Sequence, residues 1–116
     1  IDSNNFIIEN NAIIFNLEKS EILSFGLLVS SYCIPKTVKS IVDGAFRSNS
    51  CLRYIQINEG LKSIGKFAFA FCYNLEDIII PKTVRNIGYG AFMGCLISNQ
   101  RKKEIISRFG KEVFGE

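Results

Sequence analysis

The feature that most constrains the fold of this chain is an internal repeat. The segment Ile34-Pro-Lys-Thr-Val-Lys-Ser-Ile41 returns as Ile80-Pro-Lys-Thr-Val-Arg-Asn-Ile87, which begins 46 residues later, or twice 23. Midway between them, Ile57-Asn-Glu-Gly-Leu-Lys-Ser-Ile64 has the same apolar spacing. A unit this short cannot bury its apolar side alone, so neighbouring units are expected to stack and share one core. The repeat therefore predicts a β-rich solenoid.

Equivalent positions in successive units carry the same kind of apolar side chain. The groups that share this interval are Phe46, Phe69 and Phe92; Ile41, Ile64 and Ile87; and Cys72 and Cys95. We expect these residues to form the interior of the stack, with the rings about one strand spacing (~4.8 Å) apart. Because a middle unit has neighbours on both sides, we expect loss of the Phe69 ring to be the most destabilising.

Within one unit, the pattern predicts two short extended segments and a tight turn. Leu52 to Ile57 ends in strict alternation of apolar and polar residues, which indicates a strand. Val38-Lys-Ser-Ile41 indicates a second extended segment. The Asp43–Arg47 and Tyr89–Met93 segments are too short for a stable helix, and we expect one helical turn in each.

The two flanks differ from the regular units at 29–95. At the front, Phe6 to Phe15 contains two β-prone runs around Asn10-Asn11, which predicts a hairpin covering that end of the stack. Glu21 to Val29 is interpreted as a degraded unit, with Ile22-Leu23 in the columns of Ala-Phe pairs that begin at Ala45, Ala68 and Ala91. We expect 1–116 to form a single domain, with 1–28 as the N-terminal cap and degenerate repeat.

The C-terminal flank, 96–116, is expected to be a helical cap. Ile105, Ile106 and Phe109 recur at helical spacing behind a polar run, which predicts an amphipathic helix from Asn99 to Phe109. It would cover the last turn, since open ends of solenoids need covering. A basic helix lying on a membrane surface is the alternative.

Composition excludes several classes of function. Lys and Arg number 14 and Asp and Glu 11, a net charge of +3 that is too weak to indicate nucleic-acid binding. The absence of histidine removes Ser-His and Cys-His nucleophile pairs and every metal site that needs His. No integral membrane segment, metal, cofactor or catalytic residue is expected. The chain begins at Ile1 without Met, so we expect it to be a piece of a longer protein with more repeats.

The four cysteines leave three interpretations open. None forms a C-x-x-C pair. Cys72 and Cys95 share a column, so they could be buried free thiols or, because neighbouring turns approach closely enough, a disulfide. A metal site is the third possibility. Cys33 is expected to face outward and to be the most reactive.

Two strips of outward side chains are candidate binding surfaces. The first, a concave strip that we call the strand strip, follows the strands: Ser30, Ser31 and Cys33; Arg53, Tyr54 and Gln56; and Glu76, Asp77 and Ile79. Tyr54 and Ile79 could anchor a partner there, or be ordinary surface residues. Arg53 and Glu76, one turn apart, are expected to pair.

The second strip is basic. Lys39, Lys62 and Arg85 share a column, with Lys36 and Lys82 nearby. It could attract an acidic glycan or a membrane surface, or it could be a solvated edge that discourages aggregation.

The columns resemble the BspA-like leucine-rich-repeat family. The family's unit has the pattern Leu-x-x-Ile-x-Ile-Pro-x-x-Val-x-x-Ile-Gly-x-x-Ala-Phe-x-x-Cys. The segment from Leu75 to Cys95 matches every named position of that pattern, and the likeness covers about residues 29 to 95. The resemblance implies a right-handed solenoid of the α/β leucine-rich-repeat class. It also implies a non-enzymatic protein-binding module from a cell-surface or secreted adhesion protein, with a host or cell-surface protein as partner. A cytoplasmic scaffold for an intracellular protein is the alternative.

Overall fold

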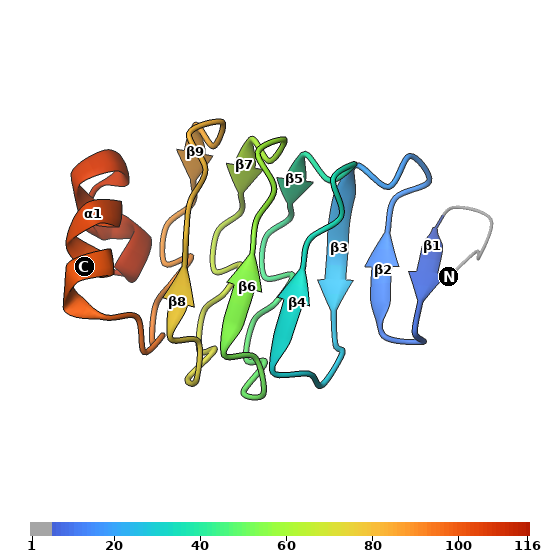
Figure 1. The fold of residues 1–116 in the computed structure, drawn as a ribbon, viewed down its shortest axis with the longest axis horizontal. Helices are drawn as coiled ribbons and strands as arrows, with labels where there is room; N and C mark the ends of the chain where they lie inside the picture. Colours follow the sequence, from blue (N-terminus) through green and yellow to red (C-terminus); the bar gives the residue numbers. More distant parts are fainter. Residues whose placement is uncertain (1–5) are drawn as a thin grey trace.

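The computed structural model describes residues 6–116 as an elongated stack of turns closed by a helix at one end (Figure 1). Within those residues the elements are β1 (Ile7–Glu9), β2 (Ile13–Phe15), β3 (Glu21–Phe25), β4 (Ser31–Cys33), β5 (Ser40–Ile41), β6 (Tyr54–Gln56), β7 (Ser63–Ile64), β8 (Asp77–Ile78), β9 (Asn86–Ile87), α1 (Asn99–Phe109) and the 3-10 helix η2 (Lys111–Phe114).

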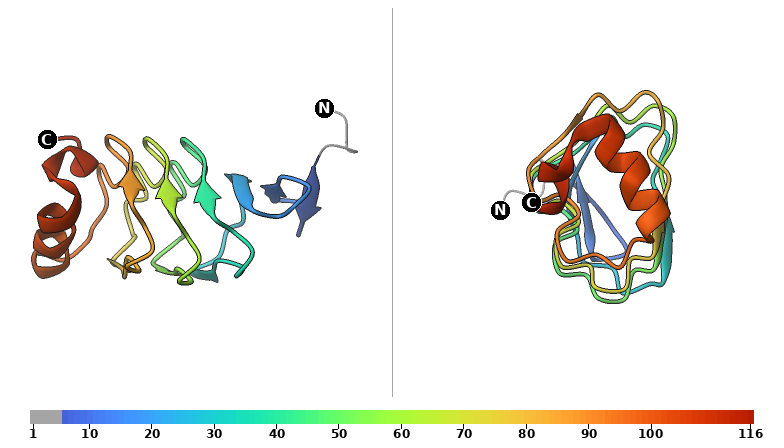
Figure 2. Two further views of the ribbon diagram at one scale, coloured as in Figure 1. Left: turned by 90° about the horizontal axis from the view of Figure 1, so that it is seen from above. Right: turned by 90° about the vertical axis from the view of Figure 1, so that its left-hand side faces the viewer.

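The strands form two sheets that run along the stack. One has six strands in the order β1-β2-β3-β5-β7-β9, and the other has three in the order β4-β6-β8. The register of the parallel pairs repeats the sequence interval: Tyr32 pairs with Ile55, which pairs with Ile78. Viewed along its length, the molecule shows successive turns overlying one another (Figure 2). The chain is therefore a solenoid whose turn is the 23-residue unit.

The core contains a ladder of aromatic rings along the solenoid. Its members, in order, are Phe25, Phe46, Phe69, Phe92 and Phe114. Neighbouring ring centroids are 4.4, 4.7, 5.6 and 5.8 Å apart. Phe46, Phe69 and Phe92 are fully buried. The three-ring column expected from the repeat is thus extended at both ends by residues outside the regular units.

The other core columns are also inside, with weaker burial in the last turn. Ile41 and Ile64 are 1% and 2% exposed, and Cys72 is fully buried. Ile87 and Cys95 are only partly buried against the core. Ile87 belongs to β9, the last strand of its sheet, so no further strand covers it.

The prediction of a helical turn in each unit is wrong. In Asp43–Arg47 and Tyr89–Met93 the backbone makes consecutive tight turns, with hydrogen bonds between residues three apart, such as the Arg47 N–H to the Gly44 carbonyl at 3.1 Å. Gly44 and Gly90 have φ angles of 69° and 66°, which a right-handed helix cannot contain. Turns of this kind let the chain reverse direction within the thickness of one unit.

The N-terminal hairpin is present, with β1 and β2 antiparallel around Asn10 and Asn11, whose φ angles are 52° and 56°. It continues the six-stranded sheet from β3. The buried residues Ile13 and Phe15 of β2 extend the core to this end.

The placement of Ile22 and Leu23 in the Ala-Phe columns is wrong. Ile22 pairs with Ile41, and Phe25 stacks on Phe46. The reason is that β3 stays extended through Phe25 to pair with β2. An extended chain advances about 3.3 Å per residue, so it reaches the ring position in fewer residues than a segment that turns.

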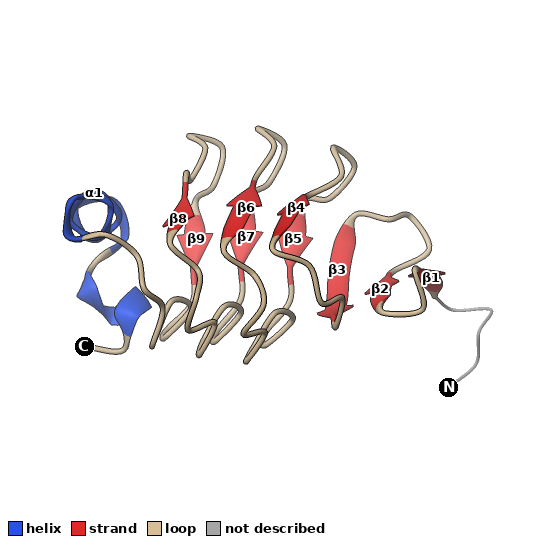
Figure 3. Ribbon diagram, turned by 60° about the horizontal axis from the view of Figure 1, so that its bottom comes forward, coloured by secondary structure: helices blue, strands red, loops and turns tan. Residues whose placement is uncertain are grey.

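Two helical elements close the C-terminal end (Figure 3). The Ser98 hydroxyl caps α1 by accepting from the Arg101 N–H, and Ile105 is buried beneath the helix. The 3-10 helix η2, which the sequence pattern does not predict, takes the place of a further turn, because the Phe92 N–H donates to the Val113 carbonyl at 2.8 Å. No helix in the described residues is long and apolar enough to cross a membrane.

Candidate functional site: the strand strip and its helical wall

The strand strip lies on the solvent face of the sheet β4-β6-β8. Alternation along β6 buries Ile55 and exposes its neighbours, and Ile78 is buried likewise in β8. Tyr54 and Ile79 are 49% and 63% exposed. Gln56 is exposed, Asp77 is half-buried, and together with Tyr54 and Ile79 these residues line a shallow groove of about 390 Å³. The strip thus combines an aromatic ring, an aliphatic side chain and polar groups around one depression.

A second, smaller groove continues the strip toward the N-terminal end. It measures about 200 Å³ and is lined by Ser31, Cys33, Tyr54 and Gln56, among others. Tyr54 therefore borders both grooves and stands at the centre of the strip.

The expected pairing of Arg53 with Glu76 is present. Arg53 Nη2 and Nε lie 2.6 and 2.7 Å from Glu76 Oε2. The hydrogen bond to Glu76 raises the pKa of the Arg53 guanidinium, and the Glu76 charge adds to this effect. The same guanidinium lies over the Tyr54 ring, 5.7 Å from its centroid. These contacts hold the polar border of the strip in a defined arrangement.

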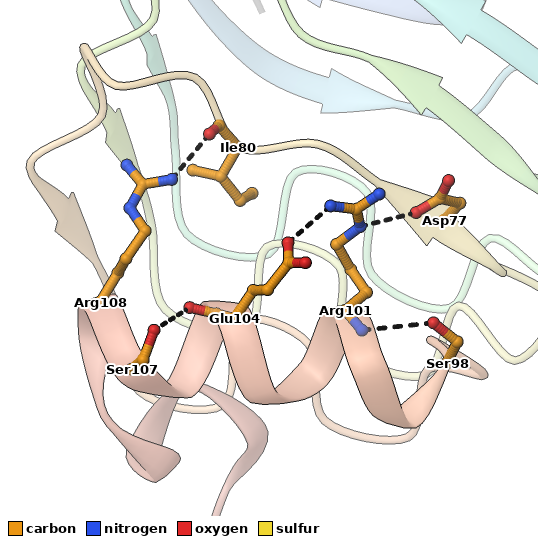
Figure 4. Close-up of polar contacts among 7 residues, drawn as sticks. All are labelled: Asp77, Ile80, Ser98, Arg101, Glu104, Ser107 and Arg108. Carbon is orange, nitrogen blue, oxygen red and sulfur yellow. Dashed lines mark hydrogen bonds and ion pairs between the residues drawn. The ribbon is translucent and has the colours of Figure 1, made fainter.

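The repeat pattern gives no indication that helix α1 takes part in the strip. Arg101 Nε donates to Asp77 Oδ1 at 3.1 Å, and Arg101 Nη1 donates to Glu104 at 2.7 Å (Figure 4). The hydrogen bond to Asp77 is the main cause of a raised Arg101 pKa. A groove of about 330 Å³ lies between Glu76 and Asp77 on one side and Gln100, Arg101 and Glu104 on the other. The helix is therefore a wall at the C-terminal end of the strip.

Arg108 fixes this wall to the last turn. Its Nη1 donates to the Ile80 carbonyl at 2.7 Å (Figure 4). Its Nη2 donates to the Pro81 carbonyl at 3.1 Å. Arg101 and Arg108 are seven residues apart, two turns of an α-helix, and so lie on one face. The seven-residue spacing of Arg101 and Arg108 is the signal in the sequence that could have identified them as the residues of α1 that contact the last turn.

The cysteines are free thiols in this structure. Cys72 Sγ donates to the Phe46 carbonyl and Cys95 Sγ to the Phe69 carbonyl, both at 3.1 Å. Burial is the main cause that raises the pKa of Cys72 to about 11 and that of Cys95 to about 12. Cys33 is exposed, as expected, and so is Cys51. In residues 6–116 no group of three or more His, Cys, Asp or Glu side chains could hold a metal ion.

The basic column lies apart from the strip. Lys39, Lys62 and Arg85 are exposed and precede β5, β7 and β9, in the loops that connect the two sheets. These loops stack along the upper edge of the molecule in Figure 1. The strand strip and the basic column are therefore two separate surfaces.

Comparison with known proteins identifies the repeat. The model of the BspA type leucine rich repeat region matches residues 4–116 in six copies. No curated protein matches the chain.

Solved structures share the fold. The pneumococcal vaccine antigen PcpA matches with a TM-score of 0.70 at 26% identity, over 82% of this chain and 30% of the antigen. A leucine rich cell surface protein from Faecalibacterium prausnitzii matches with a TM-score of 0.57 at 29% identity, over 78% of this chain and 25% of that protein. A leucine-rich repeat protein from Bacteroides capillosus has a TM-score of 0.68 over 90% and 92% of the two chains, but at 15% identity it shows the fold alone. The chain thus spans less than a third of the first two proteins.

Proposed function

Because the chain belongs to the BspA-type leucine-rich-repeat family, we propose that it is a non-enzymatic protein-binding module whose strand strip contacts the partner. The observation that carries the proposal is the exposure of Tyr54 and Ile79 beside one groove in an otherwise polar strip. A few desolvated side chains near the centre of an interface, tyrosine prominent among them, supply most of its binding energy.

The charged residues around the groove support this role. Arg53 is paired with Glu76, and Arg101 with Asp77, so these four charges are already compensated within the chain. A partner that covers Tyr54 would then desolvate pairs, which costs less than desolvating isolated charges. The wall formed by α1 limits the direction in which an extended segment of a partner could lie.

The size of the strip argues for weak or multivalent binding by this part of the protein. The strip has three strands. At about 4.8 Å for each strand it is about 14 Å long, and with a width of about 10 Å its area is roughly 140 Å². A standard stable interface buries about 800 Å² on each partner. We propose that the parent chain supplies further turns, in keeping with the greater length of PcpA and the Faecalibacterium protein.

A place at the cell surface, with adhesion to a host or cell-surface protein, is the finer proposal. It is supported by the descriptions of those two proteins as a vaccine antigen and a cell surface protein. The intracellular scaffold is kept as a second candidate because the structure has four free thiols, two of them exposed.

The test compares two double variants, each of which replaces one exposed tyrosine and one exposed aliphatic residue by serine. Tyr54→Ser with Ile79→Ser removes both exposed apolar groups of the strip. Tyr73→Ser with Leu96→Ser removes groups that are 60% and 61% exposed, outside the strip. Each immobilised protein is incubated with labelled cell-surface extract and, separately, with cytosolic extract, after thermal melts confirm that the variants are folded.

We expect the strip variant to lose a partner that the wild type and the control both retain. The extract that supplies this partner distinguishes the surface protein from the scaffold. Equal recovery of every partner by the two variants would remove the strand strip from the proposal.

A further inference from the structure

A second surface gathers cations that form no ion pair within residues 6–116. We call it the basic edge and define it by six exposed side chains in or against the loops that join the two sheets: Lys36, Lys39, Lys62, Lys82, Arg85 and Arg108. None of them belongs to the five ion pairs formed within residues 6–116. The loops themselves, at 35–40, 58–63 and 81–86, contain one carboxylate, Glu59.

The backbone holds these cations in register. The Lys62 N–H donates to the Lys39 carbonyl at 2.7 Å, and the Arg85 N–H donates to the Lys62 carbonyl at 2.9 Å. The three residues therefore follow one another at about the strand spacing, ~4.8 Å. Arg108 extends the row onto α1, because its guanidinium donates to the Ile80 carbonyl (Figure 4) and to the carbonyl of Pro81 in the last loop.

A row of like charges at this spacing is unfavourable for the protein alone. The repulsion is relieved when anions lie along the row. The regular spacing favours a linear ligand with repeated anionic groups over a single small anion, since each turn can contact a successive group.

The surface next to the row is hollowed, and polar and apolar residues line it in equal number. A groove of about 470 Å³ is lined by Ser40, Ser63, Asp43 and Glu21, among others. Ser40 and Ser63 directly follow Lys39 and Lys62 in the chain, so the groove begins one residue beyond the row of cations. Hydroxyls exchange hydrogen bonds readily with sugar hydroxyls.

The two carboxylates that line this groove, Asp43 and Glu21, restrict where an anionic ligand can lie. Asp43 already accepts a hydrogen bond from the Lys66 N–H at 2.8 Å, and Glu21 accepts one from the Ser40 hydroxyl at 3.3 Å. Glu21 lies toward the N-terminal end of the groove and would repel an anion there. The ligand is therefore expected to follow the row from Lys39 toward Arg85 and Arg108.

From these observations we propose that the basic edge binds a linear sulfated polysaccharide that runs along the solenoid across successive turns. The three loops contain no aromatic residue on which a base could stack, and this absence disfavours single-stranded nucleic acid. The basic edge meets the strand strip at Arg108, which lines a small groove together with Ile79. The proposal does not depend on the proposed function.

The experiment measures binding of a fluorescent heparin octasaccharide by anisotropy at near-physiological salt. The test variant carries Lys39→Gln, Lys62→Gln and Arg85→Gln. The control carries Lys66→Gln, Lys103→Gln and Lys111→Gln, which are exposed positions outside the basic edge and give the same net charge. The same octasaccharide after desulfation and a single-stranded oligonucleotide of similar charge are the comparison ligands.

We expect the test variant to lose at least about tenfold in affinity, since a surface of one sign of charge raises the local concentration of counter-charged ligands about 10- to 1,000-fold. The control should stay close to wild type, and the desulfated sugar should bind much more weakly. Equal losses in both variants would show that only net charge matters. That result, oligonucleotide binding as strong as heparin binding, or no heparin binding by the wild type at near-physiological salt, would overturn the proposal.

Discussion

The ring ladder makes Phe69→Ala the most direct test of the stacked core. Phe69 is fully buried, and its ring lies 4.7 Å from that of Phe46 at an interplanar angle of 24° and 5.6 Å from that of Phe92 at 9°. Truncating a buried phenylalanine to alanine costs about 3–5 kcal/mol, because both apolar contact and the filled volume are lost. A chain of this size is stable by only about 5–15 kcal/mol, so the variant should be left with much less of its stability.

A second substitution separates ring stacking from apolar burial. Phe69→Leu keeps most of the buried apolar volume but removes two aromatic pairs, each contributing about 0.5–1.5 kcal/mol. We therefore expect a loss of about 1–3 kcal/mol for leucine and a larger loss for alanine. Phe46→Ala should fall in the same range as Phe69→Ala, because Phe25 and Phe69 flank Phe46 on both sides. The expectation that loss of the Phe69 ring is the most destabilising of the three assumed that the column of rings ended at Phe46 and Phe92.

The assay is urea unfolding followed by circular dichroism, with thermal melts as a second measurement. A loss of 3–5 kcal/mol should lower the Tm by about 10 °C or more. A Tm for Phe69→Ala within about one degree of wild type would refute the stacked core. Equal losses of unfolding free energy for Phe69→Leu and Phe69→Ala would instead show that ring stacking, and not the buried apolar volume, supplies the stability at this position.

Three further outcomes follow from the packing of the turns. Gly88→Ala should reduce the free energy of unfolding by about 1–3 kcal/mol in the urea assay, because a Cβ there would lie 2.5 Å from the Lys66 backbone nitrogen. An unchanged urea midpoint would contradict the close packing of these turns. Iodoacetamide should modify Cys33 in the native protein and leave Cys72 and Cys95 unmodified, as read by mass spectrometry. Rapid modification of Cys72 or Cys95 would count against the placement of these thiols. Stability should fall as the pH rises above about 9, because the unfolded chain releases thiol protons there while the folded chain keeps those of Cys72 and Cys95 to about pH 11 and 12. The urea midpoint at about pH 10.5 should thus lie below that at about pH 8, and a constant midpoint would contradict this linkage.

The pairs that the sequence predicts are those linked by the repeat interval. Arg53 and Glu76 occupy neighbouring positions one turn apart, and the spacing alone is enough to bring them together. Asp77 and Arg101 are 24 residues apart but belong to different kinds of element, a strand and a helix. No repeat fixes the register of a helix against a turn, so this contact depends on how Ile105 and Arg108 seat the helix on the last turn.

The repeat interval also fails to predict Phe25, the ring at the N-terminal end of the ladder. Counting 23 residues back from Phe46 leads to Leu23, whereas the ring that stacks on Phe46 is Phe25. The interval holds only where each unit makes the same turns. The antiparallel pairing of β3 with β2 replaces those turns by extended chain, and a nonlocal contact of this kind leaves no periodic signal.

The amino-acid sequence by itself determined that the chain stacks, which residues face inward and which strands carry the exposed strip. It could do so because each unit meets a near copy of itself, and the same spacing then satisfies local geometry and packing together. The tertiary structure alone decided where the stack ends: which ring continues the ladder, how η2 replaces a turn, and how α1 becomes a wall beside Asp77. At an end the neighbour is not a copy, so the contacts there depend on the shape of both surfaces and not on the repeat.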